Sequence, residues 1–146
     1  MSQDIIRSVQ NLAAAKPFIN LKALNRNNNP ILAAIIEFVD FGHADYLSNI
    51  VQNPHRFSGW QLFYKFPNGY GASVTRYLIA KGWGGSYGAE DGLWQLAVLN
   101  QSGHPCYNTS VTDDVLGNLT PEEVKATLAE IVNLPPYQEG DDSSLR

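Results

Sequence analysis

Five side chains have the types and the spacing that a ligand- or partner-binding site would need. Trp83, Ser86 and Tyr87 lie in residues 80–92, a segment that holds five of the 12 glycines of the chain. Successive backbone N–H groups in such a segment can cradle a phosphate, and exposed aromatic rings can stack on a base or contact a protein. Tyr70 and Arg76 lie just before this segment, on a predicted hairpin. We therefore expect a binding site made by Tyr70, Arg76, Trp83, Ser86 and Tyr87.

The glycine-rich segment does not match a known phosphate-binding motif. A P-loop requires Gly-Lys followed by Ser or Thr at a helix start, and the dinucleotide motif also requires a helix after its glycines. Residues 80–92 lack the first motif, and a strand is predicted to follow them. A flexible connection between strands is therefore the simpler interpretation. Arg56, Arg76 and Lys81 are cations near the predicted sheet, and they could line an anion pocket or solvate its surface.

Two other pairs could do chemistry, and each has a simpler structural interpretation that we favour. Asp113 and Asp114 could hold a divalent cation, but no further acidic ligand lies at useful spacing, and capping of a helical turn at residues 115–116 explains them. His104 and Cys106 would face the same side of a strand and could form a thiolate–imidazole pair, yet a lone cysteine there is more often a small packed residue. The three histidines are too far apart in the sequence to indicate a zinc site. We therefore predict no catalytic residue, no metal ligand and no cofactor.

The elements that must position these residues begin with a helical segment, residues 1–57. Apolar residues at helical spacing predict a helix over residues 5–13, and Pro17 ends that pattern. Asn29 is a plausible N-cap for a second, strongly apolar helix that starts at Pro30. Residues 45–52 could form a third, short helix, with Tyr46, Leu47 and Ile50 facing inward.

Residues 58–134 have the pattern of an α+β core domain. Trp60, Leu62, Tyr64 and Phe66 alternate with other residues as in a strand, and residues 67–71 predict a hairpin turn in which both Asn68 and Gly69 have positive φ. Residues 72–79 give the return strand, residues 93–99 the centre of the sheet, and residues 105–108 a short edge strand. A capping box at residues 120–123 starts a helix that runs to residue 133. We expect a three- or four-stranded antiparallel sheet with this helix packed on it, followed by a flexible acidic tail, residues 135–146.

Composition and charge exclude several functional classes. The net charge of −4 gives no electrostatic footprint for nucleic acid, and one cysteine excludes a disulfide framework within the chain. The longest apolar run, residues 31–36, is too short to cross a membrane, and the N-terminus has no signal-peptide pattern. We therefore expect a protein of the cytoplasm. Only 16% of the residues are charged, and with 11% aromatic residues and an apolar helix over residues 31–39 this predicts a homo-oligomer, most simply a dimer.

Ordered short blocks of this sequence resemble a group of small uncharacterised phage and prophage proteins. The blocks follow the pattern NGYGxSV, GLWxxAVL and TDDVxGxLT at residues 68–74, 92–99 and 112–120. The resemblance covers residues 60–134, about half of the chain, and residues 81–85 lengthen a segment that is usually shorter in the group. It implies phage or prophage origin. Small accessory phage proteins often bind and block a host component, including a defence system.

The leading hypothesis is therefore a non-enzymatic, phage-derived accessory protein that binds and inhibits a host protein, with a possible role against host defence. The alternative is a protein that sequesters a nucleotide-like signal with Tyr70, Arg76, Trp83 and the glycine-rich segment. A hydrolase is the third hypothesis, which metal-dependent turnover would support.

Overall fold

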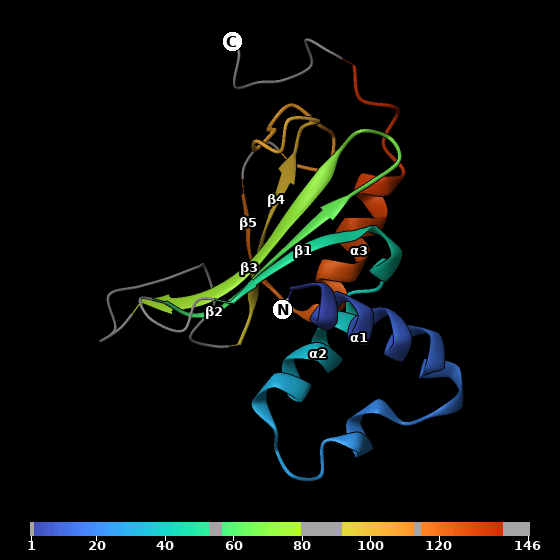
Figure 1. Ribbon diagram of the computed structural model, residues 1–146. Helices are drawn as coiled ribbons and strands as arrows, with labels where there is room; N and C mark the ends of the chain where they lie inside the picture. Colours follow the sequence, from blue (N-terminus) through green and yellow to red (C-terminus); the bar gives the residue numbers. More distant parts are fainter. Residues whose placement is uncertain (1, 53–56, 80–91, 113–114, 139–146) are drawn as a thin grey trace.

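The computed structural model describes residues 2–52, 57–79, 92–112 and 115–138 (Figure 1). These residues form α-helices, short 3-10 helices (η) and β-strands. In chain order they are α1 (Ser2–Ala15), η1 (Lys16–Phe18), η2 (Leu21–Leu24), α2 (Pro30–Asp40), η3 (Ala44–Tyr46), β1 (Leu47–Gln52), β2 (Phe57–Lys65), β3 (Gly71–Ile79), β4 (Trp94–Leu99), β5 (Leu116–Leu119) and α3 (Pro121–Val132).

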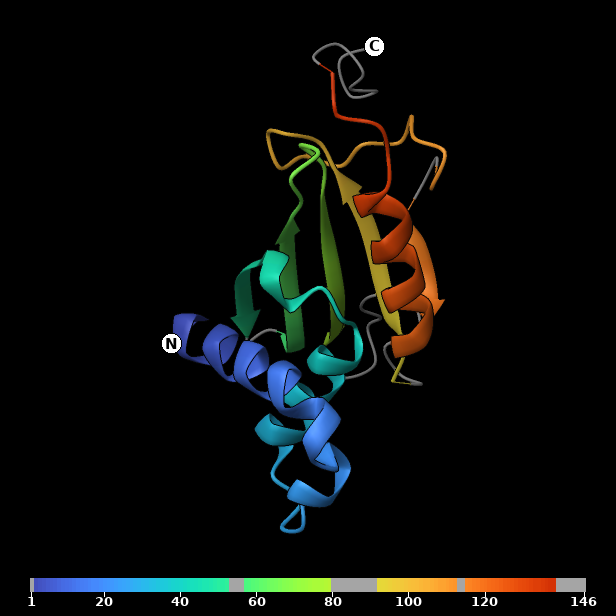
Figure 2. The ribbon, with the colours of Figure 1, turned by 90° about the vertical axis from the view of Figure 1, so that its right-hand side faces the viewer.

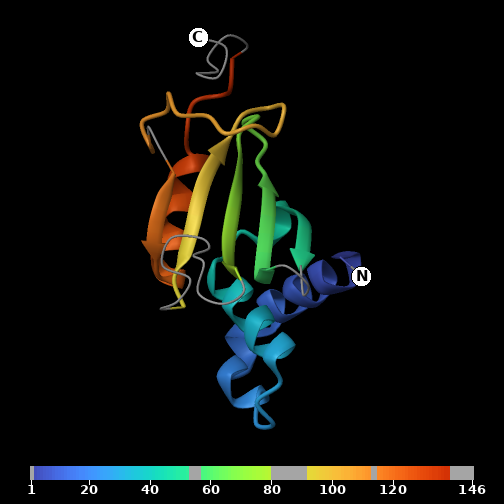
Figure 3. The ribbon, with the colours of Figure 1, turned by 90° about the vertical axis from the view of Figure 1, so that its left-hand side faces the viewer.

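The strands form one antiparallel sheet in the order β1-β2-β3-β4-β5, so each strand pairs with the next one in the chain. α3 lies along one face of this sheet, and α1 and α2 lie on the same side near the end opposite the β2–β3 hairpin (Figure 2). Figure 3 shows the other face, over which none of the helices formed by the described residues lies. The α+β class and the packed C-terminal helix are confirmed, and the sheet has five strands rather than three or four.

The two predicted helix starts that rest on a capping residue, at Pro30 and Pro121, are confirmed by local hydrogen bonds. The Asn29 side chain accepts from the backbone N–H groups of Ile31 and Leu32 at the start of α2. Thr120 and Glu123 form the predicted capping box at the start of α3. The Asn29 and Thr120 side chains therefore satisfy N–H groups in the first turn of each helix that have no partner within the helix.

The covered face of the sheet carries the core. From α2, Phe38 packs edge-on against Trp60 and Trp94, with ring centroids 5.3 and 6.0 Å apart. Phe41 packs edge-on against Trp94 at 5.0 Å. The α3 residues that face the sheet, like the apolar residues of β2, β3 and β4 beneath them, are fully buried: Val124, Leu128, Ile131, Leu62, Val74, Leu96 and Val98.

The predicted β2–β3 hairpin is confirmed, although its turn differs in detail. The Gly69 N–H donates to the Phe66 carbonyl at 3.1 Å and the Phe66 N–H to the Tyr70 carbonyl at 2.9 Å, so residues 67–69 form the loop. Positive φ is confined to Gly69, at 92°, and the prediction of positive φ at Asn68 is wrong. Such a loop is a type I turn followed by one left-handed residue. Asn68 instead donates through Nδ2 to the Ile131 carbonyl at 2.8 Å, which ties the hairpin to the end of α3.

The prediction of a helix over residues 45–52 is wrong, because this segment forms η3 and β1. Leu47 pairs with Tyr64, Asn49 with Phe63 and Ile50 with Leu62, so β1 contains one residue more than β2 over this interval. That bulge places Leu47 and Ile50, three residues apart, on the same buried face. A spacing of three is also the helical spacing, which explains the error.

The edges of the sheet also differ from the prediction. Residues 105–108 form only an isolated bridge between Leu99 and Pro105, since proline lacks the N–H that a continuing ladder needs. β5 takes the edge position beside β4 instead, and it starts at Leu116, within the helical turn predicted at residues 115–116. β3, and not β4, is the central strand. β4 is strongly apolar because α3 and the aromatic rings of α2 pack over it.

Residues on both sides of position 57 share one core. β1 pairs with β2, and a continuous cluster of buried side chains joins α1, α2, the sheet and α3. The apolar surface of α2 is largely inside this core, with Ile31 exposed at its start. That surface therefore no longer argues for a dimer, and the oligomeric state stays a prediction for light scattering. In the predicted tail, the Tyr137 N–H donates to the Asn68 carbonyl at 2.6 Å.

Candidate functional site

The candidate site is the face of the sheet over which no helix of the described residues lies. Residues opposite one another on neighbouring strands share a face, so the register defines two rows across it. The rows are Val51–Gln61–Thr75–Gln95 and Asn49–Phe63–Ser73–Ala97. We call the surface formed by these eight residues and the flanking Lys65 and Tyr77 the open face (Figure 3).

A small polar network lies at the centre of the open face. Gln61 Nε2 donates to Ser73 Oγ at 2.9 Å, and the hydroxyls of Ser73 and Thr75 lie 3.4 Å apart. Ser73 and Thr75 are only 9% and 8% exposed, so these uncharged groups lie low between larger neighbours. The centre of the open face therefore offers neutral hydrogen-bonding groups at the bottom of a shallow depression.

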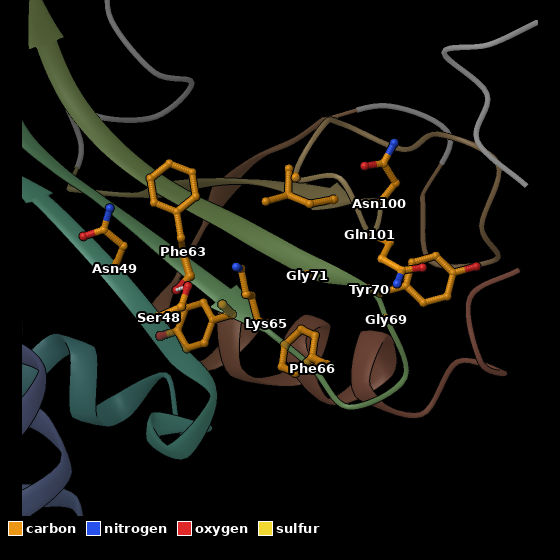
Figure 4. Close-up of a pocket in the computed structure, with 13 residues that line it drawn as sticks. Ser48, Asn49, Phe63, Lys65, Phe66, Gly69, Tyr70, Gly71, Asn100 and Gln101 are labelled. Atoms are coloured by element: carbon orange, nitrogen blue, oxygen red, sulfur yellow. Dashed lines mark hydrogen bonds between the residues drawn. The ribbon is translucent and has the colours of Figure 1, made fainter. Parts of the chain in front are cut away.

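The larger of two hollows, about 550 Å³, lies at the hairpin end of the open face. Figure 4 shows Phe63 and Asn49 toward one end of it and Tyr70 with Asn100 toward the other, with Lys65 between them. Lys65 is the one charged residue among the described residues that line this hollow. The arrangement combines an aromatic wall, side-chain amides and one ammonium group, which suits a polar ligand or a polar protein segment.

The second hollow, about 460 Å³, lies over the middle of the open face and toward β5. Its lining includes the Gln61–Ser73–Thr75 network together with Tyr77 and Ala97, and no described lining residue carries a charge. Gly59, at its border, could not be replaced without distortion, since a Cβ there would lie 1.9 Å from the Arg76 carbonyl oxygen. Backbone approach at Gly59 thus shapes the floor of this hollow.

The structure places Tyr70 and Arg76 apart, and the single site predicted for them with Trp83, Ser86 and Tyr87 stays a prediction. They are six positions apart along one extended strand, a separation of roughly 20 Å. Tyr70 lines the first hollow but is nearly buried, with the Tyr137 ring packed edge-on at 5.3 Å. Trp83, Ser86 and Tyr87 lie outside the described residues, as do Arg56 and Lys81.

Arg76 is a structural residue of the covered face. Its two terminal nitrogens donate to the two carboxylate oxygens of Glu37 at 3.0 and 2.7 Å, and Nη1 also donates to the Gly92 carbonyl at 3.0 Å. The guanidinium lies 4.2 Å from the centre of the Trp94 ring. A bidentate ion pair combined with a cation–π contact fixes α2 to β3 and β4 and commits the charge of Arg76 within the fold.

Other titratable side chains are also packed into the fold. Cys106 is fully buried, and its Sγ donates to Asn108 Oδ1 at 3.0 Å, whereas His104 is exposed, so the favoured interpretation of Cys106 as a packed residue is confirmed. Burial raises the pKa of the Tyr64 phenol well above its usual range. Burial is the largest cause and lowers the pKa of His43; a hydrogen bond with the Lys125 backbone opposes this shift, and the nearby Lys125 charge adds a smaller lowering. Among the described residues, no three His, Cys, Asp or Glu side chains are grouped to hold a metal ion.

Sequence reasoning missed the residues that form the open face. Two features of the sequence indicate this face. Gln61, Phe63 and Lys65 alternate with the buried residues of β2, and polar residues occur at the outward positions of β3 and β4, namely Ser73, Thr75 and Gln95. That alternation identifies the outward residues of each strand separately. Which of them become neighbours depends on the register between strands, which only the structure gives.

Searches of protein-family models, of curated proteins and of solved structures found no match to this chain. Within the described ranges, no helix combines the length and the apolar character needed to span a bilayer.

Proposed function

We propose that this protein is a non-enzymatic binding protein that recognises a partner protein through the open face. The observation that carries the proposal is the composition of that face, which joins neutral hydrogen-bonding groups to Phe63 and Tyr77 across two hollows. The centres of protein–protein interfaces are depleted in charge and enriched in aromatic residues, and the open face has this composition.

The partner follows from the resemblance to phage and prophage proteins. Accessory proteins of that kind often act by blocking a host component, so a host protein in the cytoplasm is the proposed target and inhibition the proposed outcome. A defence protein is the specific target class that this origin favours. Binding through the open face is the part of the proposal that does not depend on the phage resemblance, and it can be tested before the target is identified.

A matched pair of substitutions tests this function. Ala97→Arg places a long cation over the second hollow, whereas Ala126→Arg places the same side chain on the exposed surface of α3. We expect the wild type and Ala126→Arg to retain the same protein from a bacterial host lysate, and Ala97→Arg to lose it at an unchanged melting temperature. Retention by Ala97→Arg, or no protein retained by the wild type, would contradict the proposal.

The first hollow gives specific support to a second candidate function, sequestration of a small nucleotide-like molecule. Lys65 could contact a phosphate of the ligand while Phe63 stacks on its ring. The side-chain amide of Asn49 or Gln101 could form hydrogen bonds with the polar edge of that ring. Arg76 is committed to Glu37 and cannot share this role. Isothermal titration with linear and cyclic nucleotides, repeated with Lys65→Ala, separates this candidate from protein binding.

A further inference from the structure

The end of the molecule remote from the β2–β3 hairpin carries a second surface of a different kind. Residues 16–31, which we call the basic lobe, contain η1, η2 and the first two residues of α2 and project beyond the sheet (Figures 1 and 2). The large apolar side chains that are exposed in the described parts of the chain are concentrated there. They are Phe18, Ile19, Leu24 and Ile31 in the lobe, with Val51 elsewhere.

The degree of exposure is unusual for a structural role. Phe18 is 85% exposed, and Leu24 and Ile31 are 47% and 46% exposed. A single exposed apolar residue needs no explanation, but several within one short lobe indicate a surface that another molecule covers. The core already buries Leu21 and Ile36, whereas the exposed apolar residues of the lobe are not covered by the rest of the fold.

The charge of this region is opposite to that of the whole chain. No Asp or Glu occurs between Asp4 and Glu37, whereas Lys16, Lys22 and Arg26 lie in the basic lobe. Lys16 reaches Asp40 at 3.9 Å through partly exposed side chains, which is a weak pair. Lys22 and Arg26 form no ion pair with the described residues, so their charge is directed to solvent or to a partner.

A hollow of about 330 Å³ lies within this surface, between η1, η2 and α2. Ile19, Leu21 and Ile36 supply its apolar lining, and Lys16, Lys22 and Asp40 stand at the same hollow. An apolar side chain could enter it while a neighbouring carboxylate reaches the Lys22 ammonium, because Lys16 already lies 3.9 Å from Asp40. A few anchor side chains seated in well-packed pockets, most often aromatic ones, supply most of the binding energy of an interface.

We infer that the basic lobe is a docking surface for an acidic protein segment that carries an apolar anchor residue. Charge complementarity selects the acidic partner, and the hollow selects the anchor. A bilayer fits less well, because the polar loop of residues 25–29 lies beside Leu24 and would have to leave water on insertion. That loop is folded by its own amides, with Asn25 Oδ1 accepting from the Asn29 N–H at 2.7 Å.

Selection from a library of random short peptides against the immobilised full chain tests this inference. We expect enrichment of acidic peptides with one or two large apolar residues. An enriched peptide, labelled and measured by fluorescence anisotropy, should bind Lys22→Glu and Phe18→Ser about tenfold more weakly than the wild type. Its affinity should also fall as salt is added.

Matched controls use the same changes away from the lobe. Lys125→Glu reverses an exposed lysine of α3, and Val51→Ser removes an exposed apolar side chain of β1; both should bind the peptide as the wild type does. Because Phe18 and Lys22 are exposed, their variants should keep the wild-type melting temperature.

Several results would overturn the inference. Enrichment without acidic residues, no enrichment, or equal binding by Lys22→Glu would each contradict it. If the protein sediments with phosphatidylglycerol vesicles and binds no peptide, the lobe contacts a membrane instead. If the protein self-associates and Phe18→Ser abolishes that association, the lobe binds a second copy of the chain. Ala97→Arg should leave peptide binding intact, so failure here and failure of the open-face proposal are distinguishable.

Discussion

The two faces of the sheet use alternate residues of the same strands for opposite purposes. On β3, Ala72 and Val74 are fully buried beneath the helices, whereas Ser73 and Thr75 point to the open face. The covered face is closed by aromatic packing and by the Arg76–Glu37 pair, and the open face holds neutral polar groups and two hollows. One face can therefore supply the free energy of folding while the other is left for recognition.

The largest expected effect separates two adjacent residues of β2. Leu62 is fully buried on the covered face, so Leu62→Ala should lower the free energy of unfolding by about 2–5 kcal/mol. Phe63 lines the first hollow and is only partly buried, so Phe63→Ala should cost about 1 kcal/mol or less. Chemical denaturation of both variants measures the difference. Equal losses would mean that both faces are core.

The Arg76–Glu37 pair gives the next effect. Arg76→Gln removes a bidentate, partly buried ion pair and the contact with Trp94, and should lower the free energy of unfolding by about 1–3 kcal/mol. A double-mutant cycle with Glu37→Gln should return most of that loss as coupling energy. Lys65→Gln, a cation lost from the open face, is the control and should change stability by less than about 0.5 kcal/mol. An unchanged denaturation midpoint in Arg76→Gln would return this guanidinium to the list of binding candidates.

The smallest effect is a pH dependence on the covered side. Burial lowers the pKa of His43 from 6.5, so below that pH the unfolded chain takes up a proton more readily than the folded one. Stability should therefore be full above the unfolded pKa and should fall as the pH drops through the folded value. His43→Asn, which suits the positive φ of 59°, should flatten this part of the profile, and His104→Asn should not. Parallel profiles for all three proteins would show that His43 does not contribute.

Local signals in the sequence predicted the parts of the fold that local interactions build. Asn29, Thr120 and the 66–70 hairpin each depend on hydrogen bonds between residues close in the chain, and all three were identified. β1 was missed because its bulge gives the buried residues Leu47 and Ile50 a helical spacing. Its pairing with β2, which makes it a strand, is visible only in the structure. β5 was missed because a four-residue strand has too little pattern to outweigh a helix-cap interpretation.

The candidate site was less predictable than the fold. Arg76 was selected as a free cation near the sheet, but Glu37, its partner, lies 39 residues away on another element. The same limit applies to the open face, whose two rows join residues from four strands. Spacing along the chain indicates which way a strand residue points, and long-range pairing decides what it meets.

Methyl NMR of the protein with its captured partner tests the difference between the two faces most directly. The methyl signals of Thr75 and Ala97 report on the open face, and those of Ala72 and Val74 report on the covered face of β3. We expect partner binding to shift the first pair and to leave the second pair nearly unchanged. Shifts at Ala72 and Val74 without shifts at Thr75 and Ala97, or shifts confined to the basic lobe, would contradict the assignment of recognition to the open face.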